Sequence, residues 1–454
     1  MKILDRIVAL FETGWSASPL RRQFACAAAL LLVMTGWPVW FALAEPSLGL
    51  RFVRMSNEAL TIEPSYFQTR LPPGWVSGLK LQEAHIGSAK RLQITPQELL
   101  ETAGMETCYE RQNAYHARHR EIWQALQQEH VTVHVQGQSF EIQPRPKSLL
   151  ELDMRFWWPW ALSSLSLAVA LAVWLFSPNR RIAGWHLISA TSFAYIMGVV
   201  ASSSTRLLSL PPSWEFLLKA THLTGYLQSI GFCMILWHFP KALGSVQATR
   251  RLIFALFAWV AVWLTIDWFE WVDTIAVGFR LPMVAAGLVY ITLFTLQWRQ
   301  ARDQPLQRSQ LKWLMLLFGL AFSAVLIAYA YAIQTDVRID LPQAYGFSWM
   351  AMIYVGLIPL ATRLKMFALE AWWARAWAWL LGGLLVVAVD VALLLIFRIS
   401  SHQALLMSMA LAGWVYFPLR QWLWEQLLGN QRKRVQDFLP QVVQLVSLSQ
   451  QSGG

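Results

Sequence analysis

Long apolar runs separated by short polar segments dominate this chain of 454 residues. An α-helix needs about 20 consecutive apolar residues to cross a hydrocarbon core roughly 30 Å thick. The runs that meet or approach this length are, in chain order, 24–44, 157–177, 183–203, 217–239, 252–271, 279–298, 313–333, 347–362, 376–397 and 402–418. The pattern predicts a polytopic α-helical membrane protein with about ten transmembrane helices.

Composition supports this prediction, and charge orients the helices. Only 14% of the residues are charged, whereas a soluble domain usually carries about 25%. With the N-terminus inside, the segments assigned to the cytoplasm hold twenty Lys and Arg residues and the short outer loops hold four. This bias follows the positive-inside rule, so we expect both termini in the cytoplasm. The rule also accounts for the net charge of +11, and nucleic acid is not expected as a partner.

One polar segment is much longer than the others and lies between the first two apolar runs. Its position predicts the only sizeable folded domain outside the membrane. The expected organisation is a cytoplasmic segment at 1–23, a transmembrane signal anchor at 24–44, an extracytoplasmic domain at 45–156, a nine-helix membrane domain at 157–418 and a cytoplasmic tail at 419–454.

Local patterns predict a mixed α/β fold for the extracytoplasmic domain. Alternating apolar residues indicate strands at 49–55 and 78–81, and a hairpin formed by 131–135 and 139–142. Thr95 followed by Pro96 resembles a helix start and predicts a helix over 96–128. No disulfide framework is available, because Cys108 is the only cysteine in this segment. Its thiol is either unpaired or links two chains.

Acidic and aromatic residues alternate at the end of the fifth run. They can frame a pocket in the outer leaflet for a cationic or amphipathic ligand, and they equally suit a helix end at headgroup depth. The candidate ligand-sensing residues are Trp268, Glu270, Trp271 and Asp273, with Asp267 beside them. At the start of the fourth run, the residues that can pair with one another are Glu215, Lys219 and His222.

Asp390 stands alone inside the run at 376–397. A carboxylate in hydrocarbon costs several kcal/mol unless it is protonated or paired, so such a residue is a functional candidate. It allows an alternative function, a proton-coupled transporter or a lipid-handling membrane protein. A protonated Asp that hydrogen-bonds across helices is the structural interpretation of the same residue.

His116 and His119 are three residues apart on the predicted helix. This spacing can present two imidazoles to a metal, but the neighbouring arginines oppose a cation. We therefore interpret this part of the helix as a solvated face and expect no metal site. No nucleotide-binding, hydrolase or metalloprotease motif occurs in the sequence. No catalytic residue or cofactor is predicted.

Four stretches occur in a characteristic order along the chain: the turn at 136–137 with 140–144, the basic loop at 302–313, the segment 363–375, and 417–420. Together they resemble the membrane input region of ComP-like bacterial sensor histidine kinases. The resemblance implies a PDZ-like outer domain and a location in the bacterial inner membrane. The signal-transmission residues that it implies are Arg363, Phe367, Glu370, Arg375, Pro418, Leu419 and Arg420.

The sequence departs from that family at three places. Ala368 and Glu370 replace two expected aspartates, and the outer domain has no carboxylate-binding loop. No histidine follows His402, and no ATP-lid motif is present, so this chain is not expected to act as a kinase itself. It is either a fragment that ends before the kinase core or a receptor whose kinase is a separate polypeptide.

The tail carries apolar residues at coiled-coil spacing, interrupted by Pro440. It can extend a signalling helix or lie on the membrane as an amphipathic helix. We expect a transmembrane receptor that passes an extracytoplasmic or membrane signal to this tail. The expected partners are membrane lipids, an unknown extracytoplasmic ligand, a second copy of the chain, and a cytoplasmic histidine kinase or response regulator.

Overall fold

The computed structural model describes residues 20–54, 60–64, 80–81, 84–86, 92–94, 108–135, 138–177, 179–204, 210–305, 307–319 and 343–357. The chain divides into two compact units, Met1–Thr362 and Arg363–Gly454, and every described residue belongs to the first. Several predictions therefore lie outside the described residues. They are the intramembrane acid Asp390, the tail at 419–454, and the transmission residues Arg363, Phe367, Glu370, Arg375, Pro418, Leu419 and Arg420.

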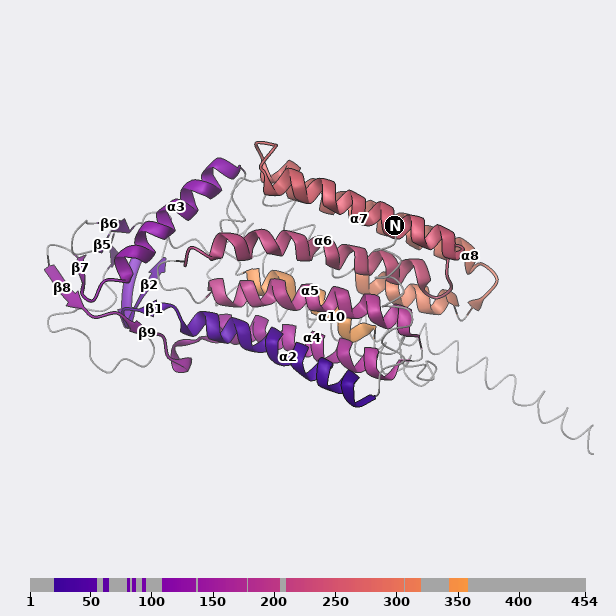
Figure 1. Cartoon of the computed structure of the whole chain (residues 1–454), viewed down its shortest axis with the longest axis horizontal. Helices are drawn as coiled ribbons and strands as arrows, with labels where there is room; N and C mark the ends of the chain where they lie inside the picture. The colour runs from indigo at the N-terminus through magenta and orange to yellow at the C-terminus, as the bar shows by residue number, and fades with distance from the viewer. Residues whose placement is uncertain are drawn as a thin grey trace, which may run out of the picture. The chain divides into compact units, whose positions relative to one another are not determined.

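Apolar helices make up most of the described chain (Figure 1). They are α2 (Leu20–Leu43), α4 (Met154–Phe176), α5 (Arg180–Ser204), α6 (Trp214–His238), α7 (Val246–Trp268), α8 (Leu281–Gln300), a helix at 307–319 and α10 (Gln343–Gly356). A short π-helix, η4 (Ala276–Arg280), leads into α8.

Five helices of this set are long and apolar enough to cross a membrane. The five segments are Arg21–Leu43, Met154–Phe176, Arg180–Ser204, Val246–Trp268 and Val277–Gln300. An α-helical membrane protein is thus confirmed, whereas the count of about ten spans stays a prediction. Helix α6 coincides with the predicted run at 217–239, although it is not one of the five.

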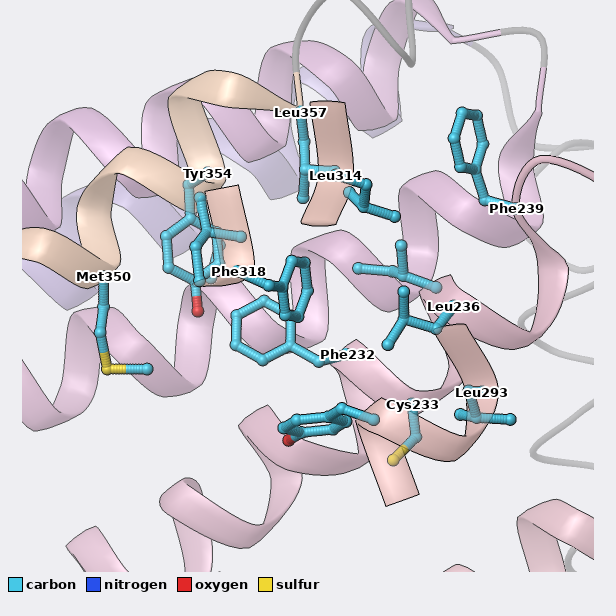
Figure 2. Close-up of a cluster of buried hydrophobic side chains, with 14 of the residues drawn as sticks. Phe232, Cys233, Leu236, Phe239, Leu293, Leu314, Phe318, Met350, Tyr354 and Leu357 are labelled. Atoms are coloured by element: carbon cyan, nitrogen blue, oxygen red, sulfur yellow. The ribbon is translucent and has the colours of Figure 1, made fainter. Parts of the chain in front are cut away.

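The centre of the bundle is a cluster of buried hydrophobic side chains, whose aromatic members come mainly from α5, α6, α8, α10 and the helix at 307–319. Phe232 packs against Phe318 and Tyr354, with ring centroids 5.0 and 5.8 Å away, as Figure 2 shows. The hydroxyl of Tyr354 accepts a hydrogen bond from Gln228 Nε2 at 2.7 Å and lies 3.0 Å from Ser189 Oγ. The polar end of this tyrosine is thus satisfied inside the bundle, as burial requires.

Close contact between α5 and α6 depends on Gly231. A Cβ at this position would lie 2.9 Å from the carbonyl oxygen of Trp185 and 2.8 Å from Cβ of Ser189. A small residue lets two helix backbones approach each other, which is the usual basis of helix association in a membrane.

Helix α7 lies at the edge of the bundle and contacts it along one narrow stripe. Its buried residues are Ile253, Val260 and Asp267, spaced by seven, which is nearly two helical turns. Apolar side chains such as Phe254 and Val262 point outward. The last residue of the buried stripe is an acid.

Residues 45–151 form an α/β domain outside the helical bundle. All strand pairs in the described part of this domain are antiparallel. One sheet has the order β2 (Leu50–Arg54), β3 (Leu60–Pro64), β4 (Lys80–Leu81), and another has the order β6 (Leu92–Ile94), β5 (Ala84–Ile86), β7 (Val131–Val135), β8 (Gln138–Ile142). The third is a two-stranded ribbon of β1 (Pro46–Ser47) and β9 (Arg145–Pro146). Helix α3 (Tyr109–Leu126) completes the domain.

Strands β2, β4, β7 and β8 confirm the predicted strands, and Val133 pairs with Phe140 in the expected hairpin. The predicted continuous helix over 96–128 is wrong at Cys108, and residues 96–107 lie outside the described part of the chain. Cys108 has an extended backbone and forms a β-bridge with Thr274, so α3 begins only at Tyr109. Strands β3, β5 and β6 were not predicted, because runs of three to five residues give little periodic signal.

Candidate functional site

Helix α3 belongs to two parts of the structure at once. Its C-terminal half contributes Ile122, Ala125 and Leu126 to the core of the α/β domain. Its N-terminal half contacts α7 and the loop that follows α7 through Tyr109 and Asn113, and Tyr115 packs against a cluster that includes Trp214 of α6. Figure 1 shows one end of α3 beside the ends of α6 and α7. We call this contact region the joint.

The centre of the joint is the buried carboxylate of Asp267. Its Oδ1 accepts a hydrogen bond from the Tyr109 hydroxyl at 2.5 Å, and its Oδ2 lies 2.6 Å from His222 Nδ1. Phe279 stacks on the His222 ring with centroids 3.9 Å apart and 12° between the planes. A buried carboxylate is costly unless donors surround it, so Asp267 holds the two partner helices to α7.

Tyr109 acts at the joint as a hydrogen-bond donor. Burial raises the pKa of its hydroxyl far above the ordinary value of 10.0, and the hydrogen bond to Asp267 raises it further. The hydroxyl therefore keeps its proton and can donate to Asp267 across the range of pH in which proteins work. The fit is close, since a Cβ added to Gly278 would lie only 2.1 Å from the tyrosine oxygen.

A second polar contact centres on Glu270, in the loop after α7. Lys219 Nζ of α6 lies 3.0 Å from Oε1, and Asn113 Nδ2 of α3 donates to Oε2 at 2.8 Å. Glu270 has φ of 54°, a left-handed conformation that is uncommon for a residue with a side chain. The two side-chain contacts hold the backbone in this conformation. One residue of the loop thus contacts both α3 and α6.

Backbone contacts, and one ion pair farther along α3, add to the joint. The amide of Tyr109 donates to the carbonyl of Asp273 at 3.3 Å, directly after the bridge between Cys108 and Thr274. Arg120 and Glu215 lie 3.9 Å apart and their side chains are partly exposed to solvent, which makes this pair weak. The strong contacts are therefore those at the N-terminal end of α3.

Helix α3 also makes an apolar contact, through an aromatic residue. Tyr115 packs against a cluster built on Trp214 of α6 and Val199 of α5. Trp37 of α2 and Tyr195 of α5 belong to the same cluster and stack with centroids 5.5 Å apart. Tyr115 thus joins α3 to an aromatic cluster that also includes residues of α2, α5 and α6.

The first and last strands of the α/β domain form a second attachment to the membrane helices. The β1–β9 ribbon joins the end of α2 to the segment that enters α4. Glu45 and Lys147 form a buried ion pair at this ribbon. The attachment therefore fixes α2 and α4 to each other as well as to the domain.

Glu151 completes this ribbon. Its carboxylate accepts from Ser47 Oγ at 2.7 Å and pairs with Arg145 at 2.7 Å. Burial by itself opposes ionisation of Glu151, but the hydrogen bonds from Ser47 and Arg145 outweigh burial and lower its pKa below the ordinary value of 4.5. The ribbon is thus held by charges that persist at neutral pH.

The structure places the four predicted sensing residues in different roles. Glu270 lies in the joint, and Asp273 contributes its backbone carbonyl. Trp268 packs edge-on against Phe216, and Trp271 is largely exposed. The expected contacts among Glu215, Lys219 and His222 are partly present: Lys219 reaches Glu215 at 3.9 Å, whereas His222 binds Asp267.

Two residues of the joint, Tyr109 and Asn113, were missed as site residues, because no local pattern distinguishes them. Asp267 was named only beside the sensing candidates, although an acid inside an apolar run could have been singled out. The expectation of a solvated face at His116 and His119 is wrong: both side chains are buried, and the His119 ring packs against Tyr115 of the same helix with centroids 4.1 Å apart. Among the described residues, no group of three or more His, Cys, Asp or Glu side chains could hold a metal.

Comparison with known proteins gives no match to a family model, a curated protein or a solved structure. The resemblance to ComP-like sensor kinases thus stays a prediction from the sequence.

Proposed function

We propose that this chain is the membrane-embedded input module of a two-component signalling system. The α/β domain would receive a ligand, and α3 would pass its displacement to α6 and α7. The observation that carries the proposal is the double role of α3, whose two halves belong to the domain core and to the joint. The four stretches that resemble sensor histidine kinases support it from the sequence.

The stiffness of α3 gives the proposal its physical basis. A helix of 18 residues is about 27 Å long, and packing holds its C-terminal half in the domain core. A tilt of the domain must therefore shift Tyr109 and Asn113 or break their contacts with Asp267 and Glu270. Because the β1–β9 ribbon fixes the domain to α2 and α4, such a tilt would move α6 and α7 relative to those two helices.

The finer features of the proposal come from the sequence. They are a PDZ-like domain, about ten spans, both termini in the cytoplasm of a bacterium, a homodimer and a kinase or response regulator that binds the tail. The residues proposed to sense the ligand remain Trp268, Glu270, Trp271 and Asp273. The alternative built on Asp390 has no support among the described residues.

A disulfide across the joint tests this proposal. Cα atoms of paired antiparallel residues are about 4.5–5.5 Å apart, a separation that a disulfide can bridge. Thr274→Cys therefore places a second thiol opposite the natural Cys108. The full chain in phospholipid vesicles would be oxidised or reduced, and hydrogen–deuterium exchange would be followed by mass spectrometry along the whole chain.

We expect the oxidised joint to change exchange in the segment 239–245, at the far end of α6 and α7, and in the tail at 419–454. The matched control is Cys108→Ser with Thr274→Cys under the same oxidant, which cannot form this disulfide. If oxidation changes exchange only at 108–126 and 269–280, the joint does not transmit and the proposal fails.

A further inference from the structure

Two aromatic rings project from the loop after α7 and are not covered by the bundle. Phe269 is 65% exposed and Trp271 is 69% exposed, and their rings stack with centroids 6.1 Å apart and 25° between the planes. Phe216, near the start of α6, is 62% exposed and contacts Trp268 edge-on. We call Phe269 and Trp271 the aromatic tip.

The turn at Glu270 presents the aromatic tip. The left-handed backbone of Glu270 reverses the chain, and its carboxylate is turned inward to Lys219 and Asn113. The residues on either side of it consequently project away from the joint. The polar contacts of Glu270 and the direction of the two rings are therefore set by the same turn.

The position of the tip in the chain indicates what the rings contact. The segment Val246–Trp268 can cross a membrane and ends one residue before Phe269, and the next such segment begins at Val277. Outward-facing apolar residues continue from the tip along both segments, at Val262 and at Leu281. Aromatic side chains at the ends of spans favour the boundary between headgroups and acyl chains.

We propose that the aromatic tip inserts into this boundary of the adjacent leaflet, which makes the leaflet a ligand of the joint. The inference rests on the proposed function and adds an input to it. A change in lipid packing, or an amphipathic molecule that enters the leaflet, displaces Phe269 and Trp271. Glu270 lies between them, so its contacts with Asn113 of α3 and Lys219 of α6 change with the position of the tip.

Spin labelling measures the depth of the tip directly. Trp271→Cys would be made in the full chain with Cys26, Cys108 and Cys233 replaced by Ser, then labelled and placed in phosphatidylcholine vesicles. Accessibility to oxygen and to a water-soluble nickel chelate would be measured by power saturation. The matched controls are Phe254→Cys on the outward face of α7, which is 64% exposed, and the exposed Glu129→Cys in the α/β domain.

We expect nickel accessibility at position 271 to be several-fold below that at position 129, and oxygen accessibility to lie between those at positions 129 and 254. Accessibilities equal to those at position 129 would place the tip in water and overturn the proposal. Low accessibility to both reagents would mean that protein covers the tip, either a second copy or another part of this chain, and would overturn it equally.

A second measurement tests the coupling to α3. Phe269→Ala with Trp271→Ala should raise hydrogen exchange at the start of α3 several-fold in vesicles, whereas Phe254→Ala should leave it unchanged. Equal exchange in the tip variant and the unmodified chain would overturn the coupling. A tip found in water, while the oxidised joint still changes the tail, refutes this inference alone. A tip at the boundary, with no response of the tail to oxidation, refutes the proposed function alone.

Discussion

Replacing Tyr109 by Phe tests whether the joint is held by the donors around Asp267. The change removes one oxygen and leaves the ring in place, so the carboxylate loses the hydroxyl that donates to it at 2.5 Å. A hydrogen bond to a charged group contributes about 1.5–3 kcal/mol. Because Asp267 is buried, solvent cannot readily replace the lost donor. The ratio of docked to undocked α3 should therefore fall roughly 10- to 150-fold.

Hydrogen–deuterium exchange of residues 109–117 in vesicles measures this ratio, since local opening controls exchange when closing is fast. The matched control is Tyr290→Phe, which removes a tyrosine hydroxyl 3.4 Å from the carbonyl of Ser229, away from α3. The control should leave exchange in α3 unchanged. Equal exchange for Tyr109→Phe and the unmodified chain, within twofold, would refute the role assigned to this hydrogen bond.

Three further predictions concern contacts of the domain and the joint. Gly278→Ala should loosen α3 as Tyr109→Phe does, because its Cβ would lie 2.1 Å from the tyrosine oxygen, whereas Gly287→Ala meets no atom within 4 Å and should have no effect on exchange. Lys147→Met removes the ammonium group that pairs with the buried Glu45 and should lower the free energy of unfolding of the domain by about 3–5 kcal/mol, measured by denaturant-dependent exchange. The double variant with Glu45→Leu should recover most of this loss, and a double variant as unstable as the single one would contradict the pairing. The lowered pKa of Glu151 contributes stability that is present above pH 4.5 and is lost as the pH falls through the pKa of Glu151 in the folded protein. Between pH 5 and pH 3, the Glu151→Gln variant should therefore lose less domain stability than the unmodified chain.

Elements with strong periodicity were predictable from the sequence. The apolar runs at 24–44, 157–177 and 183–203 correspond to α2, α4 and α5 within a few residues. The hairpin of β7 and β8 was also predictable, because five residues on each side alternate across a short turn. These signals are local, so neighbouring residues are enough to reveal them.

The joint was only partly predictable, because it brings together residues more than a hundred positions apart. Glu270 was identified as a candidate from the acids at the end of the fifth run, and Lys219 and His222 from the charges at the start of the fourth. Tyr109 is 158 residues from Asp267, and nothing near it in the sequence indicates its partner. The break at Cys108 in the predicted helix over 96–128 was missed for the same reason, since Cys108 pairs with Thr274, 166 positions away, in a β-bridge.

The double attachment of α3 has a thermodynamic consequence. Coupling between two binding sites is reciprocal, so each ligand changes the affinity of the other by the same factor. A cytoplasmic partner that favours one arrangement of α6 and α7 would then alter the affinity of the α/β domain for its ligand, although the two never touch. Under the proposed function, titrating that ligand with and without the partner would yield the coupling free energy of the whole chain, and α3 (Tyr109–Leu126) and the β1–β9 ribbon are the two described attachments that would carry it.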